Sequence, residues 1–229
     1  PVVPEVVAPA MSGRLSVRWT TVADGDLAVA TEPAVLAARR HAIAPHPWTW
    51  LHQVHGAEVV VVTDAGDGAG READAAVTVV PGAVVAVQTA DCVPVLLVGE
   101  GPAGIGVGVA HAGWRGLAAG VIARTAEALA GLGTPAVAAA CGPHIRARCY
   151  EFGPADLDDV AAACGDVVRG TTAWGTPGLD LTAGVSAACA DLGLVLDDPG
   201  TCTACSPAHF SHRARGDRGR QALVAWIEP

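Results

Sequence analysis

The sequence predicts an α+β fold, a single layered domain in which mixed β-sheets are flanked by helices. Three observations predict this class. Short valine-rich runs alternate with alanine-rich segments, the runs follow no regular strand–helix–strand period, and hydrophobic residues make up 51% of the 229 residues. A chain of this length removes roughly 70% of its accessible surface from water on folding, which allows a large core. We expect one domain over residues 1–229, with residues 1–13 as an irregular N-terminal segment.

The expected strands are short apolar runs that end at turn-forming or polar residues. They span residues 58–63, 75–80, 84–88, 94–98, 105–110, 136–140 and 223–227. Pro81 and Gly82 separate the second run from the third, and this spacing predicts a hairpin.

The expected helices are the alanine-rich segments 117–132, 156–164 and 181–192. Gly133 is placed to end the first of them, because glycine readily takes the left-handed conformation that closes a helix. Asp180 is placed to cap the N-terminus of the third.

Charge and apolar runs restrict the partners. The net charge is −9, with 23 acidic residues against 14 basic ones, so we expect no nucleic-acid binding. No apolar run reaches the roughly 18 residues that span a bilayer, and the N-terminus lacks the basic region of a signal peptide. The seven cysteines form no compact disulfide framework. We expect a cytoplasmic protein with small-molecule ligands, no membrane partner and an oligomeric state that the sequence does not predict.

Three polar motifs interrupt or follow the apolar runs, where a rigid scaffold commonly presents functional side chains. They are HQVHG at residues 52–56, TADC at 89–92 and HAGWRG at 111–116. Gly113 and Gly116 would let the backbone approach a ligand closely. A helix that starts near Gly116 would offer free backbone N–H groups to an anion.

His55, Cys92 and His111 make a plausible zinc site with a fourth position open to water or substrate. Long separations between the three residues fit a catalytic site assembled from several strand ends. Each residue also has a plainer interpretation, as a turn histidine or a buried thiol. His52 would point away from His55 on a strand, so we expect only one of them to matter.

Two further features carry polar chemistry. Asp91 lies between apolar runs, where a carboxylate is costly unless other groups satisfy it. Residues 210–221, FSHRARGDRGRQ, contain four arginines, which form either a solvated loop or an anion pocket. Cys202 and Cys205 form a lone CxxC pair, which is weak support for metal or redox chemistry.

Together these motifs resemble the YfiH-like laccase-domain family, also called polyphenol oxidases or purine nucleoside phosphorylases. The motifs HQVHG, ADAAVT, QTADCVPVLL, VAHAGWRG, CGPHIRARCYEFG and FSHRARGDRGRQ occur in that order between residues 48 and 229. The resemblance implies a layered α+β fold with His55, Cys92 and His111 as metal ligands. It also implies zinc-dependent phosphorolysis of adenosine, inosine, guanosine and methylthioadenosine, with adenosine deamination as an added activity.

The resemblance also suggests roles around the metal. Asp91 and Arg213 are expected to be catalytic, with Asp91 orienting a ligating imidazole or moving a proton. Gln53, Arg115, Ser211 and Arg220 are expected to bind substrate or phosphate. The chain departs from the family in two places: it lacks the usual GGVS segment and the later Asn-x-x-Arg near its N-terminus, and SHRAR replaces SYRR.

Three other interpretations remain open at this point. Copper-dependent phenol oxidation is one, although the single methionine, Met11, and the lack of an HxH pair are unfavourable to copper sites. A metal-free cysteine hydrolase with Cys92 as nucleophile and His111 as base is another. The third is a family member that keeps the metal only for stability.

Overall fold

The computed structural model describes residues 14–229, so the segment predicted to be irregular, 1–13, lies outside the described residues. The strands are β1 (Leu15–Trp19), β2 (Trp48–Trp50), β3 (Val59–Val62), β4 (Ala75–Thr78), β5 (Val84–Thr89), β6 (Val93–Gly101), β7 (Gly104–Ala112), β8 (Ala136–Cys141), β9 (Arg169–Thr171), β10 (Pro177–Leu179), β11 (Leu196–Asp197) and β12 (Gln221–Ile227). The α-helices are α1 (Pro33–Ile43), α2 (Trp114–Ala118), α3 (Val121–Gly131), α4 (Pro154–Cys164), α5 (Leu181–Asp191) and α6 (His212–Arg215). Short 3₁₀ turns span Val22–Asp24, Ala147–Cys149 and Asp166–Val168.

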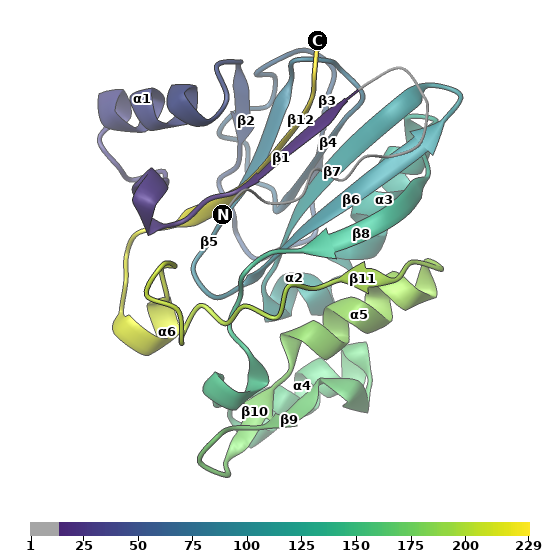
Figure 1. Cartoon of the computed structure of the whole chain (residues 1–229). Coiled ribbons are helices and arrows are strands. Elements are labelled where there is room, and N and C mark those ends of the chain that lie inside the picture. Colours follow the sequence, from purple (N-terminus) through teal and green to yellow (C-terminus); the bar gives the residue numbers. More distant parts are fainter. Residues whose placement is uncertain (1–13) are drawn as a thin grey trace.

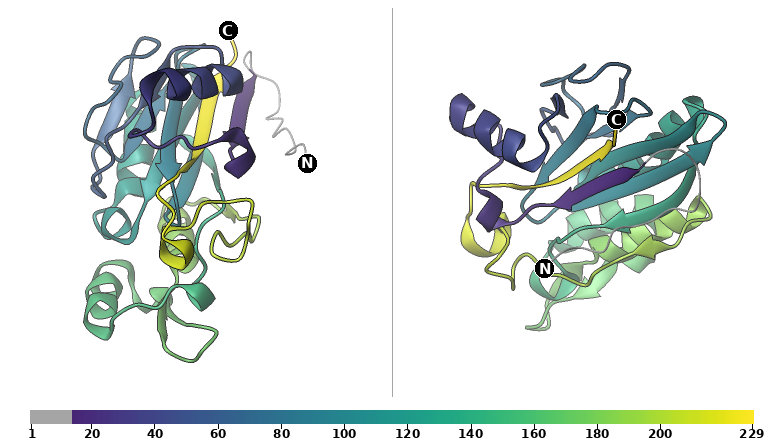
Figure 2. Two further views of the ribbon diagram at one scale, coloured as in Figure 1. Left: turned by 90° about the vertical axis from the view of Figure 1, so that its left-hand side faces the viewer. Right: turned by 45° about the horizontal axis from the view of Figure 1, so that its top comes forward.

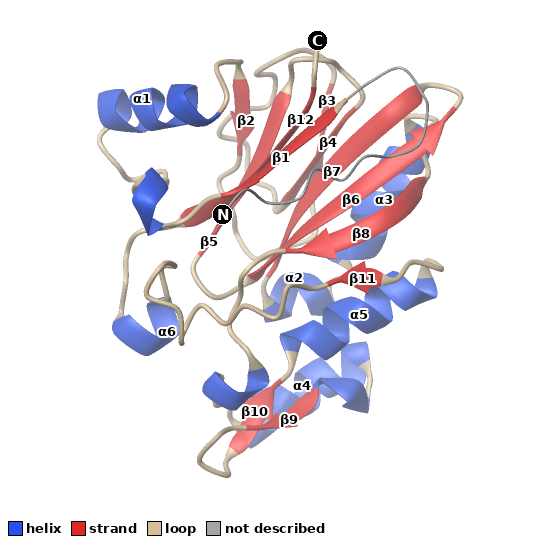
Figure 3. Cartoon of the chain, viewed as in Figure 1, coloured by secondary structure: helices blue, strands red, loops and turns tan. Residues whose placement is uncertain are grey.

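Two large sheets form the body of the protein (Figure 1). One has six strands in the order β11-β8-β6-β7-β4-β3, and the other has four in the order β1-β12-β5-β2. Most neighbours are antiparallel, but β2 and β5, β3 and β4, and β8 and β11 pair in parallel. Mixed sheets flanked by helices confirm the predicted α+β class (Figure 3).

The sheets stack in layers, and alternating side chains produce the layers. On β5, Val85 and Val87 belong to the apolar cluster between the two sheets, whereas Val84 and Ala86 belong to the cluster that includes Leu36 of α1. The far face of the six-stranded sheet packs against α2, α3 and α5, and α4 packs on α2 and α5 to extend the same apolar cluster. Figure 2 shows α1 on one side of the sheets and α3 and α5 on the other. Burial on both faces explains why the strands are nearly continuous apolar runs.

The predicted hairpin at Pro81 and Gly82 is wrong. These residues do form a turn, but β4 belongs to the six-stranded sheet and β5 to the four-stranded sheet. The turn therefore passes the chain from one sheet to the other. Two apolar strands joined by a short turn look the same in sequence whether they pair with each other or pack face to face.

The helix predicted over residues 117–132 is divided in two. Gly120 takes a left-handed conformation, with φ of +81°, and separates α2 from α3. Gly133 follows the end of α3 with φ of +77°, as predicted. Asp180 caps α5 as predicted, because its carboxylate accepts a hydrogen bond from the backbone N–H of Ala183.

Among residues 14–229, no helix has the length and apolar character needed to cross a membrane.

Candidate active site

Strand register brings the three polar motifs together at one edge of the six-stranded sheet. β6 pairs with β7 so that Val93 lies opposite Ala112, which places the preceding Cys92 beside the residues that follow β7. β4 pairs with β7 so that Ala75 lies opposite Ala110. Asp74 is thereby brought to His111, whose backbone N–H donates to the Asp74 carbonyl at 2.7 Å.

Asp74 organises this edge. Its carboxylate, which is buried, accepts hydrogen bonds from the backbone N–H groups of Val54, His55 and Gly56 at 2.7–3.1 Å. The same carboxylate lies 2.7 Å from Nδ1 of His111. One buried anion therefore fixes both the turn that carries His55 and the ring of His111. Asp74 was not among the predicted site residues; its position in the ADAAVT motif beside a strand start was the available signal.

His55, Cys92 and His111 form a cluster in which the ligand atoms all lie within 4.8 Å of one another. Sγ of Cys92 is 4.0 Å from Nε2 of His55. In a tetrahedral zinc site, bonds of about 2.0–2.3 Å separate the ligand atoms by roughly 3.3–3.8 Å. Since Asp74 engages Nδ1 of His111, Nε2 of that ring is the nitrogen left for a metal. Among the described residues this cluster contains His55 and not His52.

The backbone around the cluster is strained or tightly packed. His55 and Asp91 have positive φ angles, +60° and +99°, which are uncommon outside glycine and concentrate at functional sites. At Gly113, an added Cβ would lie 2.8 Å from Cδ2 of His55 and 3.1 Å from Sγ of Cys92. Glycine is therefore required where the start of α2 passes the two ligand side chains.

The electrostatics of the trio favour an ionised thiol. Burial opposes ionisation of Cys92, but the imidazoles of His111 and His55 outweigh it and lower the pKa of the thiol to about 6. Burial also opposes a charged His111, yet Cys92 and Asp74 raise the pKa of its imidazole to about 9. A thiolate beside an imidazolium follows at neutral pH, and binding of a metal would release the proton from His111.

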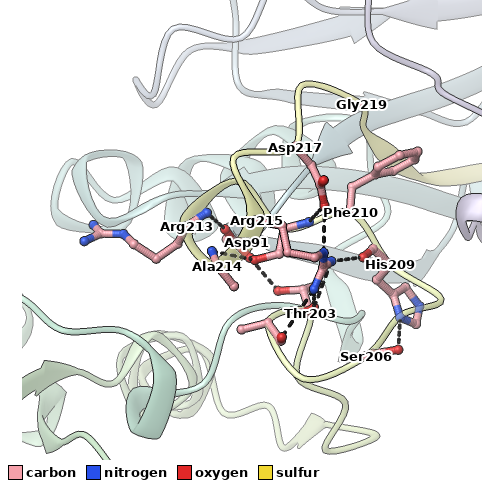
Figure 4. Close-up of polar contacts among 12 residues, drawn as sticks. Asp91, Thr203, Ser206, His209, Phe210, Arg213, Ala214, Arg215, Asp217 and Gly219 are labelled. Carbon is pink, nitrogen blue, oxygen red and sulfur yellow. Dashed lines mark hydrogen bonds and ion pairs between the residues drawn. The ribbon is translucent and has the colours of Figure 1, made fainter.

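The carboxylate of Asp91 accepts its hydrogen bonds from groups other than the imidazoles, which bears on only one of its two predicted roles, that of orienting a ligand. Its Oδ1 accepts from the hydroxyls of Thr203 and Ser211 at 2.6 and 2.7 Å, and its Oδ2 accepts from the Arg213 N–H at 2.6 Å (Figure 4). The predicted role of orienting a ligating imidazole therefore belongs to Asp74. Asp91 instead fixes the start of α6 and the position of Arg213.

Ser211, predicted to bind substrate or phosphate, does not reach the cleft. It is fully buried behind the cleft wall, donates to Asp91 and accepts from the Ala214 N–H as the cap of α6. A hydroxyl that already donates and accepts in this way is not available to a phosphate. Its effect on a ligand would pass through the placement of Arg213.

The metal cluster lies in a cleft of about 570 Å³, within the usual range for small-molecule sites. The cleft includes eight of the nine predicted site residues, all except Ser211: Gln53, His55, Asp91, Cys92, His111, Arg115, Arg213 and Arg220. The amide of Gln53 forms two hydrogen bonds with the backbone of Gln88, at 2.7 and 2.8 Å, so it also ties two cleft segments together.

The arginines that line the cleft or lie on the loop 210–221 differ in the partners of their guanidinium groups. Arg115, Arg213 and Arg218 line the cleft, are exposed, and have no carboxylate partner within residues 14–229. Arg220 lines the cleft but donates to the carbonyls of its own loop. Arg215 pairs with Asp217 and donates to the carbonyls of Thr203, Ala204 and His209, so it holds the loop rather than the cleft. Arg218 was part of the predicted arginine run but had no assigned role.

Two arginine side chains rest on aromatic rings. The guanidinium carbon of Arg115 is 4.1 Å from the ring centroid of Trp114, and that of Arg213 is 4.8 Å from the centroid of Tyr150. Burial raises the pKa of Tyr150 to about 12, which keeps its hydroxyl neutral. The rings support the cations without neutralising them.

The atypical N-terminal stretch also reaches the cleft. Ala28, Val29 and Ala30 contribute to its wall. Small apolar side chains therefore line the cleft in the N-terminal stretch that lacks the family's GGVS segment.

Comparison with known proteins agrees with the motifs. The family model described as "Multi-copper polyphenol oxidoreductase laccase" matches residues 16–228. The purine nucleoside phosphorylase of Mycobacterium tuberculosis is 39% identical over 209 residues, covering 87% of this chain and 82% of the relative. A purine nucleoside phosphorylase of Streptomyces griseus is 42% identical over 217 residues, covering 88% and 85%.

Solved structures share the fold. A Neisseria meningitidis protein described as DUF152 superposes with a TM-score of 0.79 at 26% identity, covering 97% of this chain and 98% of its own. The hypothetical protein YfiH of Bacillus licheniformis gives 0.78 at 23% identity, with coverage of 93% and 92%. The chain therefore belongs to the laccase-domain family that the motifs predict, the family whose model carries the polyphenol oxidoreductase laccase description.

Proposed function

We propose that this protein is a zinc-dependent purine nucleoside phosphorylase that acts on adenosine, inosine, guanosine and methylthioadenosine. The observation that carries the proposal is a single cleft that combines a Cys/His2 metal cluster with arginines that have no carboxylate partner within residues 14–229. Relatives about 40% identical bear the name purine nucleoside phosphorylase, which supports the same reaction class.

Phosphorolysis needs an anionic nucleophile next to the anomeric carbon of the ribose. Arg115 and Arg213 approach the cleft from α2 and α6, with Arg218 on the following loop. Guanidinium groups bind phosphate through paired hydrogen bonds, and they provide a local positive surface on a chain whose net charge is −9. That overall charge disfavours a nucleic acid as the ligand, whereas the local arginines can still bind a small anion. We expect this chemistry in the cytoplasm.

The cleft residues would divide the remaining work. Val29 and Ala28 offer apolar surface to a nucleoside, while Asp91 holds the backbone of Arg213 in place. Asp74 would keep His111 in the tautomer that presents Nε2 to the metal. When bound, zinc supplies a Lewis acid that polarises an oxygen or nitrogen of the substrate.

The donor set suits zinc better than a copper cluster. One thiolate and two imidazoles form a usual three-ligand zinc site with an open fourth position. Multi-copper chemistry would require several clustered histidine pairs. Among residues 14–229, the only candidate metal cluster with two imidazoles is that of His55 and His111, so the donors do not fit the copper chemistry in the family description.

A second candidate is a metal-free cysteine hydrolase, which one specific arrangement favours. Asp74, His111 and Cys92 stand in the order orienting carboxylate, base and nucleophile, and the thiol pKa is lowered to about 6. A metal on the thiolate would block this role, so the two candidates differ in their response to chelation.

The test is incubation of the purified protein with each nucleoside, with and without phosphate, followed by separation of products. Free base and ribose phosphate that form only with phosphate would support the proposal. Conversion of adenosine to inosine would reveal deamination in the same assay. Absence of every product, together with a lower melting temperature on chelation, would instead indicate a metal kept for stability.

Variants connect the activity to the cleft. Cys92→Ser should abolish turnover together with zinc binding at the cleft, and Arg213→Gln should raise the KM for phosphate. Arg124→Gln removes an exposed arginine on α3, outside the cleft, and serves as the matched control. Turnover that survives complete removal of metal would refute the zinc proposal and favour the cysteine hydrolase.

A further inference from the structure

Three thiols meet at a second place in the fold, outside the trio of His55, Cys92 and His111. Cys149 ends the 3₁₀ turn Ala147–Cys149, while Cys202 and Cys205 lie on the loop that follows β11. The three sulfur atoms lie within 4.8 Å of one another, and those of Cys149 and Cys205 are 3.4 Å apart. The CxxC pair that seemed isolated in the sequence therefore gains a third thiol from a distant segment.

The backbone holds these thiols in place. The N–H groups of Cys205 and Ser206 both donate to the carbonyl of Cys202, at 3.2 and 3.0 Å, which closes a tight turn around the CxxC pair. Cys202 also pairs with His144 in an isolated β-bridge. The N–H of Cys149 donates to the Arg146 carbonyl at 2.8 Å. Two independently fixed segments thus present sulfur atoms to one point.

We propose that Cys149, Cys202 and Cys205 form a second metal site, which binds one thiophilic cation of the zinc class. A tetrahedral zinc with bonds of about 2.3 Å places its sulfur ligands roughly 3.8 Å apart, a spacing that matches the scale of this cluster. Thiolates select soft cations over magnesium or calcium. The CxxC spacing matches the paired spacing of structural zinc sites.

The surroundings fit the charge and the access that such a site needs. Three thiolates and one dication carry a net charge of −1, and the Arg148 guanidinium donates to Sγ of Cys205 at 3.4 Å. Cys205 is exposed, whereas Cys202 is buried, so a cation can enter from solvent and still be held by an inner ligand.

This site would clamp two walls of the cleft. Thr203, between the two cysteines of the loop, donates its hydroxyl to Asp91 (Figure 4). Tyr150, next to Cys149, lines the cleft beneath Arg213. A cation that joins the two segments should therefore raise the melting temperature without itself contacting a cleft ligand.

The test uses the full chain, reduced, freed of metal with a chelator and titrated with cobalt(II) and then zinc. The wild-type protein should bind about two equivalents, and Cys92→Ser should keep about one, still with thiolate-to-cobalt charge-transfer absorption. Cys205→Ser should also lose about one equivalent, and the double variant should lose both. Cys164→Ser, which removes a thiol at the end of α4, is the matched control and should bind like the wild type.

A second measurement does not depend on the variants folding. Zinc added to the reduced, metal-free wild-type chain should protect Cys205 from alkylation, as read by mass spectrometry of the peptides. Cys205→Ser with undiminished stoichiometry would overturn the proposal. So would a Cys149–Cys205 disulfide whose reduction yields a protein that binds metal only at the cleft trio.

Discussion

Replacing Asp74 with asparagine tests the central claim about the site, that one buried carboxylate holds two metal ligands in position. Each carboxylate oxygen accepts two hydrogen bonds: Oδ1 from the His55 N–H and His111 Nδ1, and Oδ2 from the N–H groups of Val54 and Gly56. Asparagine keeps one oxygen and turns an NH2 group toward the other two donors. Whichever way the amide lies, two of the four donor groups then face the NH2 group of asparagine instead of an oxygen.

The size of the effect follows from these contacts. Hydrogen bonds to a charged group contribute about 1.5–3 kcal/mol each, so the loss of two predicts roughly 3–6 kcal/mol of lost unfolding free energy. Groups that orient metal ligands typically change metal affinity by about 10–100-fold. Removing the charge also removes one of the causes that raise the pKa of His111, which makes its imidazole easier to deprotonate. The affinity loss should therefore fall at the smaller end of that range.

The measurements are denaturant unfolding of the metal-free protein and competition for zinc with a chelator of known affinity. Asp180→Asn is the control, because asparagine caps a helix about as well as aspartate and Asp180 lies outside the cleft. An Asp74→Asn protein with wild-type zinc affinity and stability would refute the argument that this carboxylate builds the site. Loss of stability with full zinc affinity would limit Asp74 to a folding role.

Three more variants test separate physical points. Gly113→Ala should weaken zinc binding, because the new methyl group would lie 2.8 Å from the His55 ring, and chelator competition measures the loss. Gly120→Ala should lower the unfolding free energy by about 1–2 kcal/mol with zinc affinity unchanged, because its φ is +81° and nothing lies within 4 Å of the added atom. Burial lowers the pKa of His144 to about 4, so the unfolded chain takes up a proton below pH 6.5 that the folded chain refuses. Stability should fall by up to about 3 kcal/mol between pH 6.5 and 4, and His144→Gln should flatten that part of the curve of unfolding free energy against pH.

The fold class was predictable because strands buried on both faces leave a strong signal in the sequence. β5, β6, β7 and β12 all coincide with apolar runs. Pairing was less accessible, as the Pro81–Gly82 turn shows: local turn chemistry is the same whether two strands share a sheet or stack. The edge strands β1 and β2 were missed because their sequences, LSVRW and WTW, mix polar with apolar residues and form no continuous apolar run like those of β3 and β4.

At the site, the sequence was informative about side chains with unusual chemistry and uninformative about their supports. His55, Cys92 and His111 stand out because polar, metal-binding residues break apolar runs. Asp74 does not stand out, since a single aspartate before a strand is common in any protein. The same is true of the thiol cluster, because only the tertiary structure shows that Cys149 approaches the CxxC pair.

Asp74 and Asp91 together suggest why this edge of the fold can hold opposite charges close together. Asp74 binds the metal ligand His111, and Asp91, which is 7% exposed, binds the backbone of Arg213 at the start of α6. Each buried anion therefore stabilises one half of the cleft. The left-handed backbone at Asp91 costs about 1–3 kcal/mol, and three hydrogen bonds to its carboxylate offset that strain. The reversal of chain direction there lets Asp91 face α6 while the next residue, Cys92, faces the imidazoles. Thr203, which lies between Cys202 and Cys205, donates one of those three hydrogen bonds. The conformation of the CxxC loop and the conformation at Asp91 therefore depend on each other. A cation bound by the thiols would therefore influence the conformation at Asp91 through the Thr203 hydroxyl.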